Sequence, residues 1–319
     1  MGRDRIDRRN CGSARPLRPG SRGARCRGVS GEVPSSRAIQ CLLTGHAMQA
    51  LALLLLAGAA GTVHPAEPSS AQHLLESREC PRCNLEDVEL KGASLDGADL
   101  QGASMRDGDM KGVQLRRARL DGADLRRSDM EQAVLDSASL TGAMMVRVDL
   151  EKSSLEGADL TDAELSDVDL EDANLTRATL RDADLRRSNL KRVTATDAYF
   201  DGADLRDAVL ERGDFRKSNF RSAKLANVDM DRADLRGADL QRVDLRSAQL
   251  RRANLRGALL ARANLARAKL KLADLRGADL ATAKGLTQEQ LDLACTDNKT
   301  RLPQGLLGRQ CKDWWGDDD

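Results

Sequence analysis

A five-residue period is the strongest constraint on how this 319-residue chain can fold. From residue 85 to residue 280, every fifth residue forms a set of 40 central positions, which hold 31 Leu, five Met, three Phe and Ala195. The residue two positions earlier is always Ala, Val, Ser, Gly or Cys, and no charged residue occurs at either position. A period of five matches neither the α-helix nor the two-residue alternation of a strand. The pattern predicts a chain that turns a corner every five residues.

A square coil satisfies this period if the large central residue and the small residue two before it both point inward. Four five-residue faces make one 20-residue turn, so the 40 repeats predict about ten turns. Successive turns would stack through backbone hydrogen bonds at roughly 4.8 Å. Gly recurs two residues after the central position, for example at Gly97 and Gly122, where a corner tolerates it best. We therefore expect an all-β solenoid over residues 81–285.

The repeats also carry a recognisable consensus, A-[DN]-L-x-x. It occurs as ADLRR at 123–127, ADLTD at 158–162, ANLTR at 173–177 and ADLRG at 273–277. This consensus resembles that of the pentapeptide-repeat family. The resemblance implies a right-handed quadrilateral β-helix. Some members of that family resemble DNA in size and charge, bind gyrase and confer quinolone resistance, so the resemblance implies this activity as one candidate function.

Four central residues depart from the usual size. With 20 residues per turn, Ala195 lies next to Phe215 in one inward column, and Phe200 lies next to Phe220 in another. Because protein interiors are close-packed, we expect Phe215 to compensate for the small Ala195, and the rings of Phe200 and Phe220 to stack. The alternative is chance variation in a loose core.

The 66 residues before the coil have a different composition. Residues 1–47 contain ten Arg and three acidic residues. This composition indicates a disordered segment, a basic arm for nucleic acid, or an extension upstream of a true start at Met48. Residues 48–66 include an apolar run of 14 residues, which is too short to span roughly 30 Å of hydrocarbon but is typical of a signal peptide. We expect a periplasmic or secreted protein; a buried or anchoring helix in a cytoplasmic protein is the alternative.

Non-repeat segments flank the coil at both ends. Residues 67–80 are expected to form an N-terminal cap that includes residues 72–77. Residues 286–319 are expected to form a C-terminal cap helix and a tail. Thr287 and Gln290 have capping-box spacing, which predicts a helix that runs to about residue 294. Its expected apolar contacts are Leu286, Leu291 and Leu293.

One pair of cysteines lies at each end of the coil: Cys80 with Cys83, and Cys295 with Cys311. A zinc site built from all four is excluded, because about ten turns separate the two pairs. In an oxidising compartment, both pairs would form structural disulfides that clamp the caps. Free thiols, or a redox motif at Cys80 and Cys83, are the alternatives, although no βαβ unit surrounds that motif.

The net charge of +1 hides a separation of charge along the coil. Residues 81–180 contain 12 basic and 22 acidic residues, whereas residues 181–284 contain 24 basic and 15 acidic ones. An acidic column and its neighbours occupy the first half: Glu89, Asp109, Asp129, Asp149, Asp169, Glu131, Glu151, Glu171 and Asp172. A basic column in the second half is partly neutralised by nearby Asp residues; its members are Arg216, Arg236, Arg256 and Arg276.

The acidic column has several interpretations. The column is interpreted as a solvated face that keeps the coil soluble, as a mimic of a duplex backbone, or as a site for a basic protein. Stacked carboxylates also bind divalent cations weakly, but the sequence contains no enclosing calcium loop. The two oppositely charged halves predict a weak antiparallel homodimer, or a partner contacted by one half only, that is lost at high salt. Contact through the C-terminal cap leucines is the competing route to a dimer.

No sequence motif indicates an enzyme. The chain has no glycine-rich phosphate loop or nucleophile elbow, and its only histidines are His46, His64 and His73. We expect no cofactor, no metal, no small-molecule substrate and no direct nucleic-acid binding, since the near-neutral total charge argues against a nucleic-acid coat. The predicted function is that of an exported, non-enzymatic module presenting charged flat faces to an unidentified protein partner.

The alternative function is cytoplasmic protection of a type II topoisomerase by DNA mimicry. Three features separate this chain from the gyrase-binding relatives: the apparent export signal, the basic second half, and a register that never slips from residue 85 to residue 280.

Overall fold

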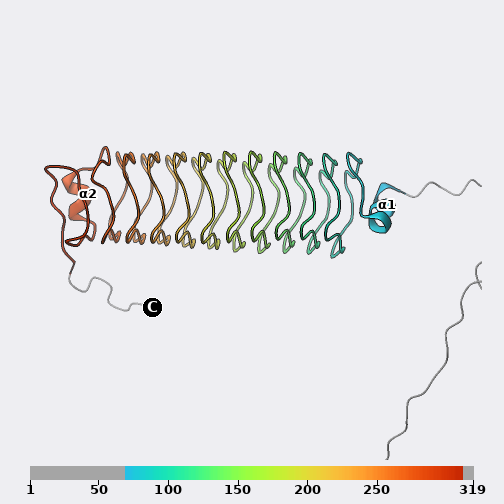
Figure 1. The fold of residues 1–319 in the computed structure, drawn as a ribbon, viewed down its shortest axis with the longest axis horizontal. Coiled ribbons are helices and arrows are strands. Elements are labelled where there is room, and N and C mark those ends of the chain that lie inside the picture. The colour runs from blue at the N-terminus through green and yellow to red at the C-terminus, as the bar shows by residue number, and fades with distance from the viewer. Residues whose placement is uncertain (1–68, 312–319) are drawn as a thin grey trace, which may run out of the picture. The chain divides into compact units, whose positions relative to one another are not determined.

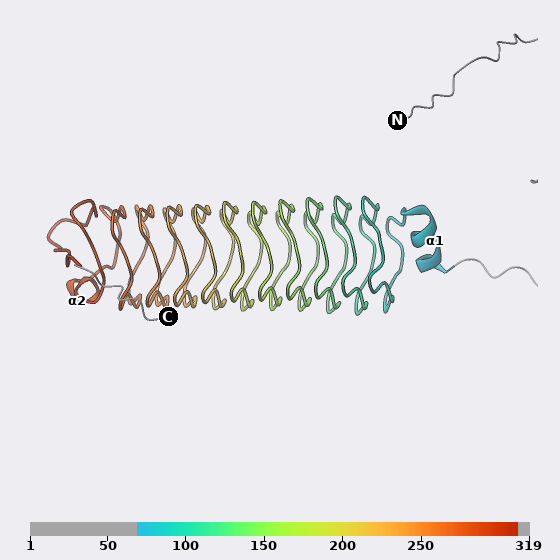
Figure 2. The same cartoon turned by 90° about the horizontal axis from the view of Figure 1, so that it is seen from below.

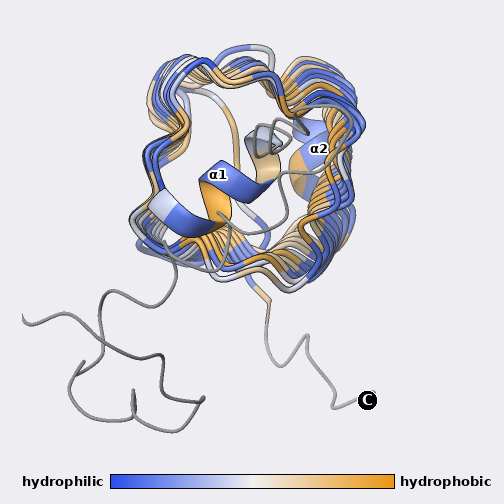
Figure 3. Cartoon of the chain, turned by 90° about the vertical axis from the view of Figure 1, so that its right-hand side faces the viewer, coloured by the Kyte–Doolittle hydropathy of each residue, from blue (hydrophilic) through white to orange (hydrophobic). Residues whose placement is uncertain are grey.

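The five-residue repeats form a coil of stacked turns in the computed structural model, which describes residues 69–311 (Figure 1). Parallel β-bridges join each turn to the next between residues 20 apart, from Glu79–Asp99 to Asn264–Lys284. Seen along its axis, the coil has four corners, and successive turns superpose (Figure 3). The repeats are therefore a β-solenoid with four faces per turn. The predictions for residues 1–47, 48–66 and the tail from 312 concern residues outside the described range.

Backbone hydrogen bonds hold neighbouring turns together on every face. In one example, the Leu95 N–H donates to the Gln114 carbonyl at 2.7 Å, and the Gln114 N–H donates back to Ala93 at 2.8 Å. A third bond joins the corners, from the Gly97 N–H to the Arg116 carbonyl at 2.8 Å. Each face contributes a single bridged residue per turn, so the described residues contain isolated bridges and no longer strand.

A tight turn makes each corner. The Ala98 N–H donates to the Leu95 carbonyl at 3.0 Å, and Gly97 between them has a φ of 72°. A positive φ is what the third residue of a type II turn requires, and Gly adopts it without steric cost. Asp87 and Arg117 occupy the same place in their repeats with φ of 56°. The backbone therefore turns in the same way whether or not the repeat supplies a Gly.

We number the faces by their central residues: 85 to 265 in steps of 20 for face 1, 90 to 270 for face 2, 95 to 275 for face 3, and 100 to 280 for face 4. On each face, the residue before the central one forms the bridge, and the two residues after it form the corner. Outward side chains at equivalent positions stack in columns along a face.

The interior is filled by the central residues, all 40 of which are at most 3% exposed. Burying one Leu side chain stabilises a fold by about 1.5–3 kcal/mol. The inward columns are thus the main source of stability.

The three phenylalanines form one cluster in this interior. The rings of Phe200 and Phe220 are stacked, with centroids 4.7 Å apart and planes inclined by 4°. The Phe215 ring meets both edge-on, at 6.1 and 5.7 Å. Ala195 is fully buried in the column of Phe215. A Cβ placed on Gly213 would overlap the Phe215 ring, so Gly213 also provides space for that ring, a relation that the sequence analysis missed.

Helix α1 (Ser70–Ser77) closes the N-terminal end of the coil (Figures 1 and 2). Ser69 caps it by accepting the Gln72 N–H on Oγ at 3.3 Å. Leu74 is fully buried and belongs to the same core as the inward columns. The helix begins two residues before the expected segment 72–77, because the Ser69 cap precedes it.

Helix α2 (Gln288–Asp292) lies at the opposite end (Figures 1 and 2). Gln290 Oε1 accepts the Thr287 N–H at 2.8 Å, and the Gln290 N–H donates to Thr287 Oγ1 at 3.3 Å. The side-chain amide of Gln290 also donates to the carbonyls of Leu265 and Ala268, at 3.0 and 2.8 Å. The capping residue therefore fastens the helix to the coil.

Helix α2 ends before the expected residue 294, because Cys295 rejoins the ladder in a parallel bridge with Asp274. Leu291 is fully buried and Leu286 packs against the core. Leu293, in contrast, is 47% exposed, so its predicted role as a core contact is wrong. Among the described residues, neither helix has the length and apolar character that a membrane span requires.

Candidate interaction surfaces

Three outward arginines on face 3 are neutralised within their own repeat. The Asp214 carboxylate accepts the Arg216 backbone N–H at 3.2 Å and binds its guanidinium at 2.6 Å. The same arrangement occurs on faces 1 and 3 in these pairs: Asp124–Arg126, Asp184–Arg186, Asp204–Arg206, Asp214–Arg216, Asp234–Arg236, Asp244–Arg246 and Asp274–Arg276. The Arg246 guanidinium holds the pKa of Asp244 below its usual value. A D-L-R repeat therefore adds little net charge to the surface.

The basic column predicted on face 3 is largely neutral for this reason. Three of its four members pair with the Asp of their own repeat. The fourth, Arg256, follows Asn254 and reaches the Asp274 carboxylate at 4.0 Å. The column does not present four free cations.

Face 2 carries the predicted acidic residues along its first half. Bridges between consecutive turns place the ladder residues side by side. We call the whole set the acidic strip: Glu89, Asp109, Asp129, Asp149 and Asp169, with Glu131, Glu151, Glu171 and Asp172 at the adjoining corner. The fold thus brings all nine predicted residues together on one face.

Lysines neutralise the beginning of the acidic strip. Lys91 lies 2.9 Å from the Asp109 carboxylate. Lys111 lies 3.1 Å from both Asp129 and Glu131, and its ammonium lowers the pKa of Glu131. These early turns present alternating charges to solvent.

The carboxylates at the far end of the acidic strip are also bound by side chains of the next turn. Arg192 binds Glu171 at 2.5 Å and Asp172 at 2.7 Å. Asn189 donates its amide to Asp169 at 3.0 Å and to Glu171 at 2.9 Å. The hydrogen bond from Asn189 is the largest factor that lowers the pKa of Glu171.

Uncompensated negative charge remains in the middle of the strip. Lys152 pairs with Glu151 at 2.6 Å, whereas Asp149 forms no ion pair within residues 69–311. Burial raises the pKa of Asp149, and the carboxylates of Asp129 and Asp169 above and below it add to the shift. Asp149 therefore has no counterion among the described residues.

The second half of face 2 carries the opposite charge, and we call it the basic strip: Arg232, Arg251, Arg252, Lys269 and Lys271. Asp231 lies 3.6 Å from Arg251 and 4.0 Å from Arg232. The side chains of the other three cations form no ion pair or hydrogen bond within the part of the chain that the structure describes. A hollow of about 360 Å³ lies here between Asp231 and Leu272.

The sequence analysis did not identify the basic strip, although a signal was present. Arg192, Arg212, Arg232 and Arg252 recur every 20 residues at one corner of face 2. Their separation from carboxylates increases along the column: Arg192 is bound twice, Arg212 lies 3.5 Å from Glu211, and Arg232 lies 4.0 Å from Asp231. Arg252, Lys269 and Lys271 on face 2 therefore have no counterion in the described residues, whereas the column predicted on face 3 is largely paired.

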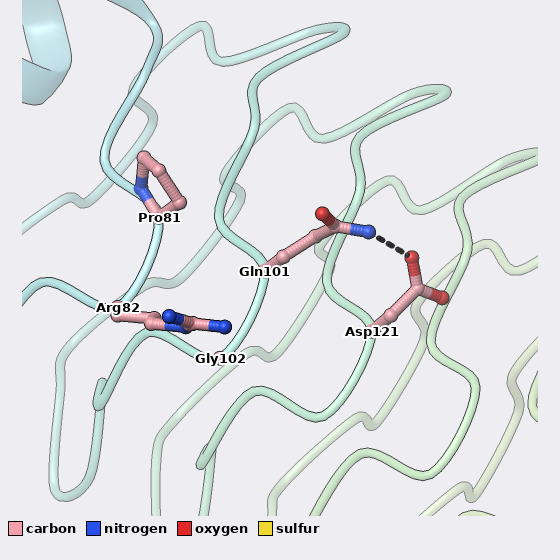
Figure 4. Close-up of a pocket in the computed structure, with 5 residues that line it drawn as sticks. All are labelled: Pro81, Arg82, Gln101, Gly102 and Asp121. Carbon is pink, nitrogen blue, oxygen red and sulfur yellow. Dashed lines mark hydrogen bonds between the residues drawn. The ribbon is translucent and has the colours of Figure 1, made fainter.

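A larger hollow, of about 610 Å³, lies beside the N-terminal turns and is lined by Pro81, Arg82, Gln101, Gly102 and Asp121 (Figure 4). The Gln101 amide donates to Asp121 at 2.9 Å, and the Thr141 N–H donates to the same carboxylate at 3.3 Å. These polar groups satisfy one another and form no pairing of a nucleophile with a base.

The four predicted cysteines are paired at the two ends of the coil. The Cα atoms of Cys80 and Cys83 are 5.3 Å apart, and those of Cys295 and Cys311 are 5.5 Å apart, so each pair lies within the reach of a disulfide. Within residues 69–311, no group of three or more His, Cys, Asp or Glu side chains is placed to hold a metal ion.

Comparison with known families identifies the repeats. The Pentapeptide repeats profile matches in eight copies, over residues 83–122, 114–151, 153–192, 173–212, 214–249 and 248–284. The predicted family resemblance is thus confirmed. No sequence among the curated proteins matches the chain.

Solved structures include several similar coils. HetL, a pentapeptide repeat protein involved in heterocyst differentiation regulation in the cyanobacterium Nostoc sp. strain PCC 7120, is 36% identical. That match covers 63% of this chain and 92% of HetL, with a TM-score of 0.53. A trypsin-treated form of QnrB1, a plasmid-mediated fluoroquinolone resistance protein, is 20% identical over 60% of this chain and 87% of its own, with a TM-score of 0.29.

Proposed function

Because the chain belongs to the pentapeptide-repeat family, we propose that it is a non-enzymatic interaction module whose flat charged faces bind a protein partner. The observation that carries this proposal is the uncompensated charge on face 2, negative around Asp149 and positive around Lys269 and Lys271. Complementary charge of this kind steers association and sets orientation. The right-handed quadrilateral coil implied by the family resemblance, with the roughly ten turns that 40 repeats predict, supplies the flat faces.

Two further observations support a role in binding. The interior is filled by central residues that are at most 3% exposed, so a ligand has access only to the outer faces. HetL, which is 36% identical, is a protein involved in regulation. A regulatory role is one that an interaction module can fill without chemistry of its own.

Partner capture tests this function. The full chain is immobilised and exposed to extracts of the producing cells, alongside Asp149→Lys/Glu151→Lys and a matched control, Asp162→Lys/Asp182→Lys. The control residues are exposed, lie on face 4 and form no ion pair within residues 69–311. We expect a protein that the wild type and the control retain and the face 2 variant loses. An identical set of retained proteins on all three would contradict a role for face 2.

We also propose that the protein is exported and that both cysteine pairs form disulfides in the cell. The apolar run after Met48 and the closeness of the paired cysteines support this. Fractionation with N-terminal sequencing should find a periplasmic or secreted protein that begins between about Gly58 and Glu67. Recovery of intact residues 1–47, or of four alkylatable thiols in freshly isolated protein, would overturn export.

The alternative, topoisomerase protection in the cytoplasm, makes a different prediction. A DNA mimic should protect gyrase from a quinolone in a supercoiling assay, whereas the proposal for an exported module expects no protection. The cations Lys91, Lys111 and Arg192 along the acidic strip reduce the likeness of this face to a polyanion.

A further inference from the structure

Face 2 reverses its charge halfway along the coil. The acidic strip occupies the turns up to Asp172, and the basic strip occupies the turns from Arg232 to Lys271. Lys191, Glu211 and the neutral Asn189 lie between them. The strips run along the same columns of the same face, so any partner that matches one half must be repelled by the other unless it also reverses sign.

A second copy of this chain is a partner that reverses sign in the same way. Two copies can pack with face 2 against face 2, related by a two-fold axis. This axis lies in the plane of the interface and is perpendicular to the direction of the coil axis. This operation reverses the coil direction but keeps each outward column opposite the same column of the partner. The columns suit such contact, because successive turns superpose along the axis (Figure 3). A parallel pairing would instead place acidic turns opposite acidic turns.

One antiparallel register matches most charges of face 2 between Asp149 and Lys271. In this register the two-fold axis passes through the turn that contains Glu211. A residue a given number of turns before this turn then lies opposite the residue of the same column that is the same number of turns after it in the second copy. The resulting pairs, one residue from each copy, are Asp149–Lys269, Glu151–Lys271, Glu171–Arg251, Asp172–Arg252 and Lys191–Asp231. Symmetry repeats every pair, so both ends of the interface are matched.

Neighbouring registers keep some complementary pairs, such as Glu151–Arg251, but oppose more like charges. Sliding the partner by one turn in one direction places Asp169 opposite Asp229, and sliding it in the other places Lys191 opposite Arg251. Like charges in direct opposition are destabilising. The charge pattern therefore selects a position as well as a direction.

Two features of the preferred register need an account. Glu211 and Arg212 of both copies lie at the axis, where each carboxylate can reach the guanidinium of the other copy diagonally. Arg192 lies opposite Arg232, but Glu171 and Asp172 already bind Arg192 within its own chain. At the centre, Arg192 is therefore already compensated, and Arg232 lies 4.0 Å from Asp231 of its own chain.

We propose that face 2 is a self-association surface on which a second copy of this chain binds antiparallel, with its two-fold axis at Glu211. The inference rests on the proposed function as an interaction module and names the partner of one face. It also gives Asp149, which forms no ion pair within residues 69–311, an ammonium partner from Lys269 of the second copy.

Sedimentation of the purified full chain tests the proposal. We expect a reversible dimer at about 50 mM salt that dissociates at about 1 M, because the paired charges are screened. A chain that is monomeric at both salt concentrations would overturn the proposal. A dimer unaffected by salt would also overturn it and would point instead to the exposed Leu293 of the C-terminal cap.

Charge exchange tests the register. Lys269→Glu/Lys271→Glu and Asp149→Lys/Glu151→Lys should each weaken the dimer by about 100-fold or more, because every altered pair becomes a like-charge pair. An equimolar mixture of the two variants should associate again, as should the chain that carries all four substitutions. Failure of both to recover would overturn the register.

A matched control separates position from net charge. Arg242→Glu/Arg262→Glu makes the same charge change with two cations that form no ion pair within residues 69–311 and lie at a different corner. This variant should dimerise like the wild type; equal weakening would show a non-specific charge effect.

Heparin binding distinguishes a second occupant of the basic strip. If the wild type is monomeric and binds heparin, and Lys269→Glu/Lys271→Glu abolishes that binding, the strip is a polyanion site. Partner capture from extracts is measured separately, so the proposed function can survive the failure of this inference.

Discussion

The inward columns and the outward columns of face 2 share one 20-residue register but obey different constraints. Inside, 39 of the 40 central positions hold Leu, Met or Phe, and none of the 40 is charged. On face 2, one outward column contains Glu131, Lys191, Glu211 and Arg251 at equivalent places. An inward side chain is enclosed by neighbours on all sides, whereas an outward one meets solvent and at most a few charged groups. The inside therefore restricts size, and the outside restricts only the arrangement of charge.

This difference indicates where specificity can arise in such a coil. Outside the cluster of three phenylalanines, the core repeats similar contacts along its length and differs little from turn to turn. Outward charges distinguish turns at little cost, because surface ion pairs contribute only about 0–1 kcal/mol each to stability. The inward columns thus provide stability and the outward columns provide recognition. Substitutions in one set of columns should therefore change one property and leave the other largely unchanged.

The largest effect should come from the inward column that contains Phe215 and Ala195. Phe215→Ala should destabilise the coil by about 3–5 kcal/mol, since the site cannot collapse around the lost ring. Ala195→Leu alone should cost about 1–3 kcal/mol through overpacking. The swap Ala195→Leu/Phe215→Leu should recover most of the loss in thermal and urea unfolding. If the two substitutions simply add, the two side chains do not compensate each other.

Gly213 gives a smaller effect at the same site. Gly213→Ala should destabilise by about 1–3 kcal/mol, because the new Cβ would overlap the Phe215 ring. Most repeats carry Ala at this position, so the substitution is acceptable to the backbone. In combination with Phe215→Leu, the same Gly213→Ala change should be tolerated. Equal destabilisation in both backgrounds would show that the ring is not the cause.

Substitution of Asp149 should increase the free energy of unfolding modestly and in a pH-dependent way, whereas the core substitutions above decrease it. Its pKa is raised in the folded state, so ionisation is less favourable there than in the unfolded chain. The stability linked to the protonated form is present below the unfolded pKa and is lost as the pH rises through the folded one. Asp149→Asn keeps the oxygen that accepts the Glu151 N–H and should stabilise the monomer by roughly 0.2–1 kcal/mol at neutral pH.

The gain from Asp149→Asn should disappear below about pH 4, where both states of the wild type are protonated. Urea unfolding at several pH values measures this, at protein concentrations low enough to keep the chain monomeric. A gain that persists in acid would show that repulsion between carboxylates is not its source.

The smallest effect on stability is expected for the basic strip. Lys269→Glu/Lys271→Glu should change the free energy of unfolding of the monomer by less than about 0.5 kcal/mol, because neither side chain has an ion-pair partner within residues 69–311. The same variant is expected to abolish self-association. A loss of stability comparable to that of Gly213→Ala would mean that the outward columns also hold the coil together.

The period in the sequence was sufficient to predict the solenoid, the inward columns and the neighbours of every residue 20 positions away. A strict period fixes the direction of each Cβ and therefore which side chains share a column. For this reason the acidic strip and the adjacency of Ala195 with Phe215 were accessible from the sequence. The ends were less accessible, because the period stops there: helix α2 ends at Asp292, and Leu293 is exposed.

Only the tertiary structure decided which charges are already paired. A register gives the position of each Arg but not the partner of its long side chain, which can reach an Asp in its own repeat or in a neighbouring turn. Arg216 chooses Asp214, two residues before it, whereas Arg192 reaches back 20 residues to Asp172. The Arg column of face 3 is therefore neutral, whereas Lys269 and Lys271 on face 2 remain without a counterion in the described residues. The sequence determined where the charges stand, and the reach of the side chains determined which of them are left for a partner.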